Sequence, residues 1–192
     1  LEMGGNNPLV VWDVKDLDAA VHHTIFSAFV SGGQRCTCAR RLIVQNNAAG
    51  DAFVARLVQV ASQLVVGKSD AEPAPFMGPV VSSKIAERLV QAYHDLIAKG
   101  GTSLLEMKHL QANTGFVSAG IVDVTKASGI PDEEWFGPLL QIYRVSDFAE
   151  AMKIANNTQF GLAAALIADD ADLWQRFQFE ARAGVVNWNR PT

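Results

Sequence analysis

The amino-acid sequence predicts an α/β domain in which a mostly parallel, twisted sheet is flanked by helices. Runs typical of strands alternate along the chain with stretches of helical periodicity. The strand-like runs, such as residues 8–12 (P-L-V-V-W), are apolar throughout, as in strands that are buried on both faces. The chain has 192 residues, of which 49% are hydrophobic and 19% charged, so it is long enough for one large domain with a substantial core.

In the first third of the chain, single residues mark the ends of the first predicted helix. Asp16 is a suitable N-cap for this helix, and Gly32 and Gly33 are suited to end it. A second helix is predicted from an apolar stripe at helical spacing. The predicted elements are a strand at 8–12, a helix at 17–31, a strand at 41–45, a helix at 51–62 and a loop at 66–79.

The rest of the chain continues the alternation of strands and helices. Ser82 or Ser83 is expected to cap a long helix that ends at Lys99, before Gly100 and Gly101. An acidic loop is predicted at 127–136. The other predicted elements are strands at 102–107, 116–124, 139–145, 161–168 and 184–189, and helices at 147–155 and 171–183.

Charge and composition exclude several classes of protein. The formal net charge of −4 is unlike the basic footprint of a nucleic-acid-binding protein. No apolar run approaches the length of a membrane span, and no signal peptide is visible. The two cysteines are separated by one residue, so a disulfide between them would not stabilise a fold, and we expect a reducing, cytoplasmic setting. The chain starts at Leu1 and ends just after a strand-like run, so we expect it to be a fragment of a longer protein.

The most informative stretch is residues 31–41 (S-G-G-Q-R-C-T-C-A-R-R), which contains both cysteines and three arginines. Cationic neighbours favour the thiolate of a cysteine, which is its reactive form. The alternative is a pair of small cysteines buried in a turn. This loop enters a strand, whereas ligands in parallel sheets gather where strands end, so the fold alone does not place the loop in a cleft.

Two other chemistries for Cys36 receive little support from the sequence. A Cys–His hydrolase would need a histidine, and the candidates His22, His23 and His94 are not close to the cysteine in sequence. A zinc site would need two ligands beyond Cys36 and Cys38, and the sequence has no second cluster, so we predict no metal.

Two acidic segments are further candidates. Glu2 precedes two glycines and could be a poised general base or a solvated glutamate. In residues 131–138 (P-D-E-E-W-F-G-P), acids beside aromatic rings could bind ribose hydroxyls, or form an acidic surface loop. The sequence has no G-x-G-x-x-G and no phosphate-binding P-loop. If the reaction needs a nucleotide, most of its site must therefore lie outside this chain.

Four segments together resemble the aldehyde dehydrogenase superfamily. Their order and spacing match over almost the whole chain, which makes the set far more specific than any one motif. The segments are residues 2–8 (E-M-G-G-N-N-P), which resemble E-L-G-G-K-x-P; 33–37 (G-Q-R-C-T), which resemble G-Q-x-C-T/C; 133–138 (E-E-W-F-G-P), which resemble E-E-x-F-G-P; and 155–164 (A-N-N-T-Q-F-G-L-A-A), which resemble A-N-x-x-x-Y-G-L-A-A.

This resemblance implies specific roles for residues of the chain. Cys36 would be the nucleophile and Cys38 only its neighbour, while Glu2 would be the general base for the deacylating water. Glu134 would bind the ribose on the nicotinamide side of NAD, or of NADP, and Phe136 would pack near the nicotinamide. Residues 1–192 would be the catalytic domain. The NAD-binding domain and part of the oligomerisation arm of a homo-oligomer would lie elsewhere in the protein.

The implied reaction oxidises an aldehyde to a carboxylic acid through a cysteine thiohemiacetal and thioester. The first two segments and residues 184–191 (G-V-V-N-W-N-R-P) resemble a bacterial branch that acts on a succinylated amino-acid semialdehyde during arginine breakdown. Such a small-molecule substrate is anionic, so Arg35, Arg40 and Arg41 are candidates to bind it; alternatively, the last two pair with surface acids. The other readings are a non-catalytic assembly module and a cofactor-independent thiol esterase.

Overall fold

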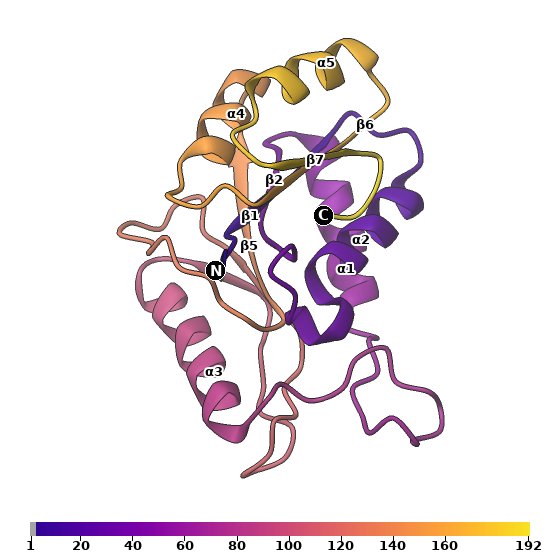
Figure 1. Cartoon of the computed structure of the whole chain (residues 1–192), viewed down its shortest axis with the longest axis vertical. Helices are drawn as coiled ribbons and strands as arrows, with labels where there is room; N and C mark the ends of the chain where they lie inside the picture. Colours follow the sequence, from indigo (N-terminus) through magenta and orange to yellow (C-terminus); the bar gives the residue numbers. More distant parts are fainter. Residues whose placement is uncertain (1–2) are drawn as a thin grey trace.

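The computed structural model describes residues 3–192, and within them it contains one sheet of seven strands between two layers of helices (Figure 1). The strand order is β3-β4-β5-β2-β1-β6-β7, and every pair is parallel except β3–β4. The predicted fold class is confirmed. The strands are β1 (Asn7–Trp12), β2 (Ala39–Gln45), β3 (Thr102–Leu105), β4 (Gly120–Asp123), β5 (Leu139–Val145), β6 (Ala163–Ala168) and β7 (Val185–Trp188).

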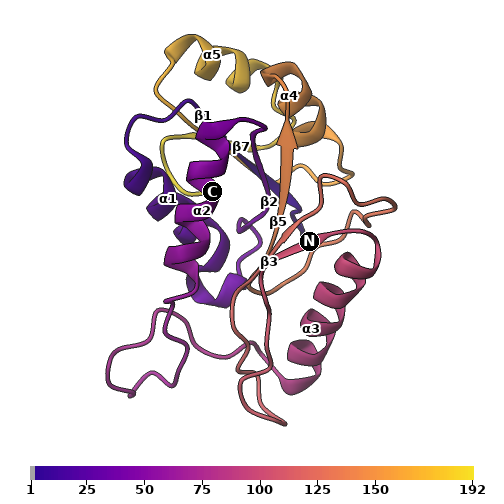
Figure 2. The same ribbon diagram turned by 180° about the vertical axis from the view of Figure 1, so that it is seen from behind.

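Helices cover both faces of the sheet, as Figures 1 and 2 show from opposite sides. Leu9 and Leu42 pack in a core cluster with α1 and α2, whereas Val10 and Ile43 pack in a second cluster with α4 and α5. A third cluster lies under α3. Burial on both faces explains why these strands contain continuous apolar runs such as Leu42–Val44. The helices are α1 (Leu17–Phe29), α2 (Ala48–Ala61), α3 (Ser83–Ala98), α4 (Phe148–Asn156), α5 (Ala171–Glu180) and the 3₁₀ turn η1 (Val30–Gly33).

The carboxyl ends of the central strands lead into helices that begin at side-chain caps. Asp16, Asn47, Asp147 and Asp170 each accept a hydrogen bond from a backbone N–H in the first turn of α1, α2, α4 and α5. These bonds satisfy donors that a helix start otherwise leaves unpaired. The predicted cap at Asp16 is confirmed, and Ser82 is the cap of α3.

Several predicted boundaries were wrong by a few residues, each for a local reason. The first helix ends at Phe29 because Ser31 and Gly32 adopt positive φ angles of 57° and 64°. The second helix begins earlier than predicted, because Asn47 caps it. The predicted strand at 116–124 is only β4, because Ser118 bonds back to Lys108 in a separate antiparallel turn.

The amino ends of the parallel strands gather the segments that carry the family resemblance. Residues 4–6 precede β1, 34–38 precede β2, 131–138 precede β5 and 156–162 precede β6. Strands that run in the same direction bring these segments to one edge of the sheet. We call this the amino edge and the opposite side the carboxyl edge. No helix among the described residues is long and apolar enough to cross a membrane.

Candidate active site

The loop that carries Cys36 is held close to the loop before β5 by Gly33. Gly33 has φ of +68°, and a Cβ at this position would lie 2.2 Å from the carbonyl oxygen of Gly137. Only glycine tolerates both the left-handed backbone and this close approach. The two segments of the family resemblance that contain Gly33 and Gly137 therefore touch through their backbones.

Gln34 ties the same loop to the segment before α3. Its Nε2 donates to the carbonyl oxygen of Pro79 at 3.2 Å, and its Oε1 accepts from the N–H of Val81 at 2.9 Å. A side chain that both donates and accepts across 45 to 47 residues of sequence braces the loop from one side.

The two cysteines lie in different environments. Cys36 is exposed, whereas Cys38 is buried, with 1% of its surface accessible. The Cys38 sulfur lies 4.0 Å from the carbonyl oxygen of Val30, inside the protein. Only Cys36 offers its thiol to a molecule arriving from outside this chain.

Asn7 holds the backbone on both sides of Thr37. Its Nδ2 donates to the carbonyl oxygens of Cys36 at 2.7 Å and Cys38 at 2.9 Å. Its Oδ1 accepts from the N–H of Ala163 at 3.0 Å. This buried amide therefore joins the thiol loop to the starts of β1 and β6. We did not single out Asn7 from the sequence, because nothing local in N-N-P marks its long-range partners.

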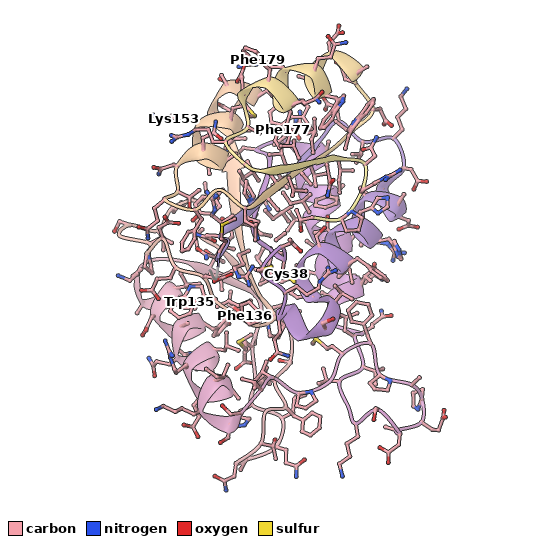
Figure 3. The ribbon with its side chains drawn as sticks, viewed as in Figure 1. Cys38, Trp135, Phe136, Lys153, Phe177 and Phe179 are labelled. Carbon is pink, nitrogen blue, oxygen red and sulfur yellow. The ribbon has the colours of Figure 1, made fainter. Side chains whose placement is uncertain are left out.

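Glu134 and Phe136 lie next to this loop and are both accessible. Glu134 Oε1 accepts from the N–H of Gly5 at 2.9 Å and lies 3.6 Å from Nη2 of Arg40. A Cβ on Gly4 would lie 2.5 Å from Oε2 of Glu134, so the glycine leaves space beside that oxygen. The Glu134 side chain is 22% exposed and Phe136 is 42% exposed. Figure 3 labels Phe136 and Trp135 beside Cys38 near the middle of the molecule.

Arg40 and Arg41 are both buried, which changes their expected roles. Arg41 donates to the carbonyl oxygens of Asn6 at 2.8 Å, Ile154 at 2.8 Å and Ala155 at 3.0 Å, and so satisfies the end of α4. Arg40 donates to carbonyl oxygens nearer to Cys36. Burial lowers the pKa of each guanidinium, although both stay charged near neutral pH. Both guanidiniums are buried and donate to protein carbonyl oxygens, whereas Arg35 is exposed.

Asp132 joins the loop before β5 to two other segments of the amino edge. Its carboxylate accepts from Nδ2 of Asn6 at 2.8 Å, Oγ1 of Thr158 at 2.7 Å and the N–H of Gln159 at 2.7 Å. Burial opposes ionisation, but these hydrogen bonds outweigh it and hold the pKa of Asp132 below its ordinary value. The sequence of residues 131–138 indicates an acidic surface loop or a ribose site, and nothing in it indicates that Asp132 joins three segments of the amino edge.

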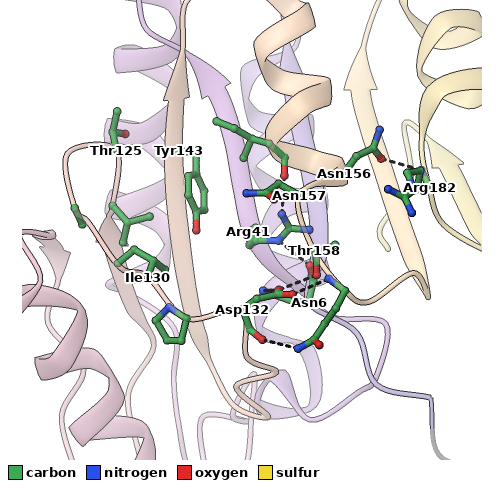
Figure 4. A pocket seen from close by; sticks show the side chains of 15 residues that line it. Asn6, Arg41, Thr125, Ile130, Asp132, Tyr143, Asn156, Asn157, Thr158 and Arg182 are labelled. Atoms are coloured by element: carbon green, nitrogen blue, oxygen red, sulfur yellow. Dashed lines mark hydrogen bonds between the residues drawn. The ribbon is translucent and has the colours of Figure 1, made fainter.

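A polar pocket of about 510 Å³ opens beside this network (Figure 4). Arg41, Asp132 and Tyr143 line it, and burial raises the pKa of the Tyr143 hydroxyl. Neither Cys36 nor Glu134 lines this pocket. Among residues 3–192, no group of three His, Cys, Asp or Glu side chains could hold a metal ion.

The structure thus brings three of the four predicted site residues to one edge of the sheet. Cys36, Glu134 and Phe136 lie on adjoining loops that share contacts with Arg40. Glu2, the predicted base, lies outside the described residues. The resulting arrangement combines an accessible thiol with an accessible carboxylate and aromatic ring.

Comparison with known proteins identifies the class to which this arrangement belongs. The family model described as the aldehyde dehydrogenase family matches residues 1–192, so the chain belongs to that family. It is 59% identical over 191 residues to the N-succinylglutamate 5-semialdehyde dehydrogenase of Chromobacterium violaceum, and 58% identical over 191 residues to that of Acinetobacter baylyi. The resemblance predicted from the four segments is confirmed, and so is the resemblance to this branch.

These curated relatives are longer than the chain. Each match covers 100% of this chain but only 39% of the relative. The chain therefore corresponds to about two fifths of such a protein.

Solved structures support the same fold. A structure described as an Escherichia coli NADP-dependent enzyme superposes with a TM-score of 0.90 at 33% identity, covering 100% of this chain and 40% of the other. A 1-pyrroline-5-carboxylate dehydrogenase from Thermus with bound NAD superposes with a TM-score of 0.88 at 30% identity, covering 98% of this chain and 36% of the other. Relatives with both nicotinamide cofactors thus share this domain.

Proposed function

We propose that the full-length protein oxidises N-succinyl-L-glutamate 5-semialdehyde to N-succinyl-L-glutamate with NAD, as a step of arginine catabolism. The observation that carries this proposal is the exposed Cys36, on a loop that Arg40 joins to the loop of Glu134 and Phe136. The identity of 59% to a dehydrogenase of that name supports the choice of substrate. The remaining part of the polypeptide would supply most of the cofactor-binding surface.

Cys36 would form the covalent intermediates. Its thiolate adds to the aldehyde carbon, and the carbonyl electron pair moves to oxygen, giving a tetrahedral thiohemiacetal. The backbone N–H of Cys36 would donate to the developing oxyanion. The carbonyl oxygens of Cys36 and Cys38 are held by Asn7, so the backbone that carries the thiol is held in place during the attack.

The residues at the amino edge fit a nicotinamide cofactor. Both contacts of Glu134 within the described residues use Oε1, which leaves Oε2 for a ribose hydroxyl. Phe136 presents an exposed ring beside it, suited to pack against a flat heteroaromatic group. When bound, NAD would accept the hydride that leaves the aldehyde carbon, so that Cys36 carries a thioester.

Glu2 would complete the reaction as the general base. It would take a proton from the water that attacks the thioester, and the thiolate of Cys36 would leave with its electron pair. Replacing Glu2 by Gln should let the acyl-enzyme accumulate. Rapid-quench mass spectrometry would detect the adduct on Cys36, and its absence would argue against Glu2 as the base.

Arg35 would recognise the carboxylates of the substrate. It is next to Cys36 and exposed, and it donates to the carbonyl oxygen of Phe26 only at the long distance of 3.5 Å. Arg40 and Arg41, in contrast, are buried and donate to protein carbonyl oxygens at shorter distances. Arg35→Met should raise KM for the succinylated semialdehyde by about tenfold or more, as for the loss of one charge-assisted hydrogen bond, and leave KM for a neutral aldehyde nearly unchanged. An equal rise for both aldehydes would reject this role.

The decisive experiment compares the two cysteines in the full-length protein. NADH formation would be measured with a panel of aldehydes that includes N-succinylglutamate semialdehyde. Cys36→Ala should abolish activity. Cys38→Ala, which removes a buried thiol two residues after Cys36, should keep most of the activity. Equal loss in two folded variants would overturn the assignment of the nucleophile.

The choice of substrate is tested in the same panel. Strong preference for the succinylated substrate supports the proposal, and activity on simple aldehydes alone would remove the arginine-catabolism role. Activity on no aldehyde would favour a non-catalytic module. Ester hydrolysis without cofactor would favour a thiol esterase instead.

The setting proposed for this reaction is the cytoplasm, where an exposed thiol such as Cys36 stays reduced. The full-length protein would act as a homo-oligomer, as is usual in the family, with no nucleic-acid or membrane partner. Sedimentation of the purified protein would test the assembly.

A further inference from the structure

Arg40 connects the thiol loop to the loop that carries Glu134. Its Nη1 donates to the carbonyl oxygen of Cys38 at 2.7 Å and its Nη2 to that of Arg35 at 3.1 Å. Its Nε donates to the carbonyl oxygen of Trp135 at 2.9 Å. One planar guanidinium thus holds the backbone on both sides of Cys36 and the residue that follows Glu134.

The same guanidinium also touches the side chains proposed to meet the cofactor. Nη2 lies 3.6 Å from Oε1 of Glu134, and the guanidinium carbon lies 5.4 Å from the centre of the Phe136 ring. These distances are within the range of an ion pair and of a cation–π contact. Arg40 is 1% exposed, so water does not screen either contact as it would at the surface.

The next residue, Arg41, is also a buried arginine, but it binds a different part of the molecule. Successive residues of a strand point to opposite faces, and Arg41 binds the end of α4 on the other side of β2. Arg41 is thus committed to the scaffold, whereas the hydrogen bonds, the ion pair and the cation–π contact of Arg40 within the described residues go to the two site loops.

We propose that Arg40 is a positioning residue that couples occupation of the ribose site at Glu134 to the orientation of the Cys36 thiol. A ribose held by Glu134 fixes its carboxylate. The fixed carboxylate holds the guanidinium against the carbonyl oxygens of Arg35 and Cys38, and Cys36 between them takes one orientation. This inference rests on the proposed function, because it uses the roles assigned there to Glu134 and Cys36.

The coupling is measured as the effect of NAD on the alkylation of Cys36 in the full-length protein, with no aldehyde present. The probe is iodoacetamide, and mass spectrometry of the Cys36 peptide gives the rate with and without saturating NAD. In the unaltered protein the two rates should differ by about fivefold or more, the low end of couplings between sites. In Arg40→Met the ratio should fall close to one.

Three further variants separate coupling from a structural effect. Glu134→Gln weakens the contact proposed for the ribose and should reduce the ratio of the alkylation rates with and without NAD. Combining it with Arg40→Met should reduce this ratio no further, since both residues act in one chain of contacts. Arg40→Lys, which keeps the charge, should retain part of the ratio. Arg144→Met is the matched control, because Arg144 pairs with Asp51 and Asp123 at the carboxyl edge and should leave the ratio unchanged.

The outcomes discriminate clearly. If Arg40 has a purely structural role, Arg40→Met changes the alkylation rates with and without NAD by the same factor and keeps their ratio, which would overturn the proposal. A ratio of one in the unaltered protein would overturn it as well. If Arg40→Met does not fold, Arg40→Lys and Glu134→Gln decide the result. A ratio that depends on Arg40 in a protein that oxidises no aldehyde would keep this inference and reject the proposed reaction.

Discussion

The two edges of the sheet are built from different kinds of interaction. At the carboxyl edge, helix starts are closed by caps such as Asp16 and Asp147, which bond to the N–H three residues further on. At the amino edge, the bonds of Gly5 to Glu134 and of Asn7 to Ala163 join residues 129 and 156 positions apart. The helix caps of the carboxyl edge form locally, although longer-range contacts such as Arg144 with Asp51 also lie there, whereas the bonds that join the loops of the amino edge exist only once the whole sheet has formed.

This difference explains where the candidate site lies. Ligands of open parallel sheets usually bind at the carboxyl ends of the strands. Here the carboxyl edge carries capped helix starts and the ion pairs of Arg144 with Asp51 and Asp123, although a cavity of about 220 Å³ also opens at the ends of β1 and β2. The amino edge instead collects four loops, and buried side chains such as Asn7 and Arg40 bind their backbones together. A rigid brace of this kind suits a nucleophile that must be held in place.

The largest expected effect is the loss of a buried brace at the amino edge. Arg41→Met would leave the carbonyl oxygens of Asn6, Ile154 and Ala155 without their donor, and we expect the free energy of unfolding to fall by about 3 to 4 kcal/mol. Urea unfolding would measure it. The matched change at the carboxyl edge, Arg144→Met, breaks one pair with the exposed Asp51 and one with the mostly buried Asp123, and should lower it by about 2 kcal/mol. Equal losses would remove the distinction between the edges.

An intermediate effect is expected at Asp132, and it should depend on pH. Because the pKa of this carboxyl is lower in the folded protein than in the unfolded chain, its charge stabilises the fold above the ordinary carboxyl range, about pH 4. That contribution is lost as the pH falls through the folded pKa. Asp132→Asn should therefore be less stable than the unaltered chain at pH 7, and the gap should close toward pH 3. A gap that does not change with pH, in urea midpoints from pH 7 to 3, would contradict this account.

The smallest expected effect is the loss of one local cap. Asp147→Ala removes the bond to the N–H of Glu150 and should lower the free energy of unfolding by about 1 kcal/mol, without changing the alkylation rate of Cys36. Thermal unfolding and iodoacetamide labelling of the same sample would check both parts. A changed labelling rate would mean that the two edges are coupled, contrary to their separate construction.

The features that could be predicted from the sequence are the local ones. The cap at Asp16 and the strands with apolar runs were recognisable, and the first helix was predicted two residues too long, to Ser31. The predicted strand at 116–124 was too long, because Ser118 pairs with Lys108, and no propensity in the apolar run shows that partner. The environments of the two cysteines could not be told apart either, since Cys36 and Cys38 are both small residues in one turn.

The sequence by itself determined the α/β class, most helices and strands, and the family. Periodicity and caps are properties of neighbouring residues, and the order and spacing of motifs can be read along the chain without knowing its fold. Only the tertiary structure decided that Arg35 is exposed while Arg40 and Arg41 are buried, and that Asn7, Asp132 and Arg40 brace the amino edge. The physical reason is that burial and long-range hydrogen bonds depend on which loops the parallel strands bring together. That arrangement is a property of the assembled sheet and of no single segment.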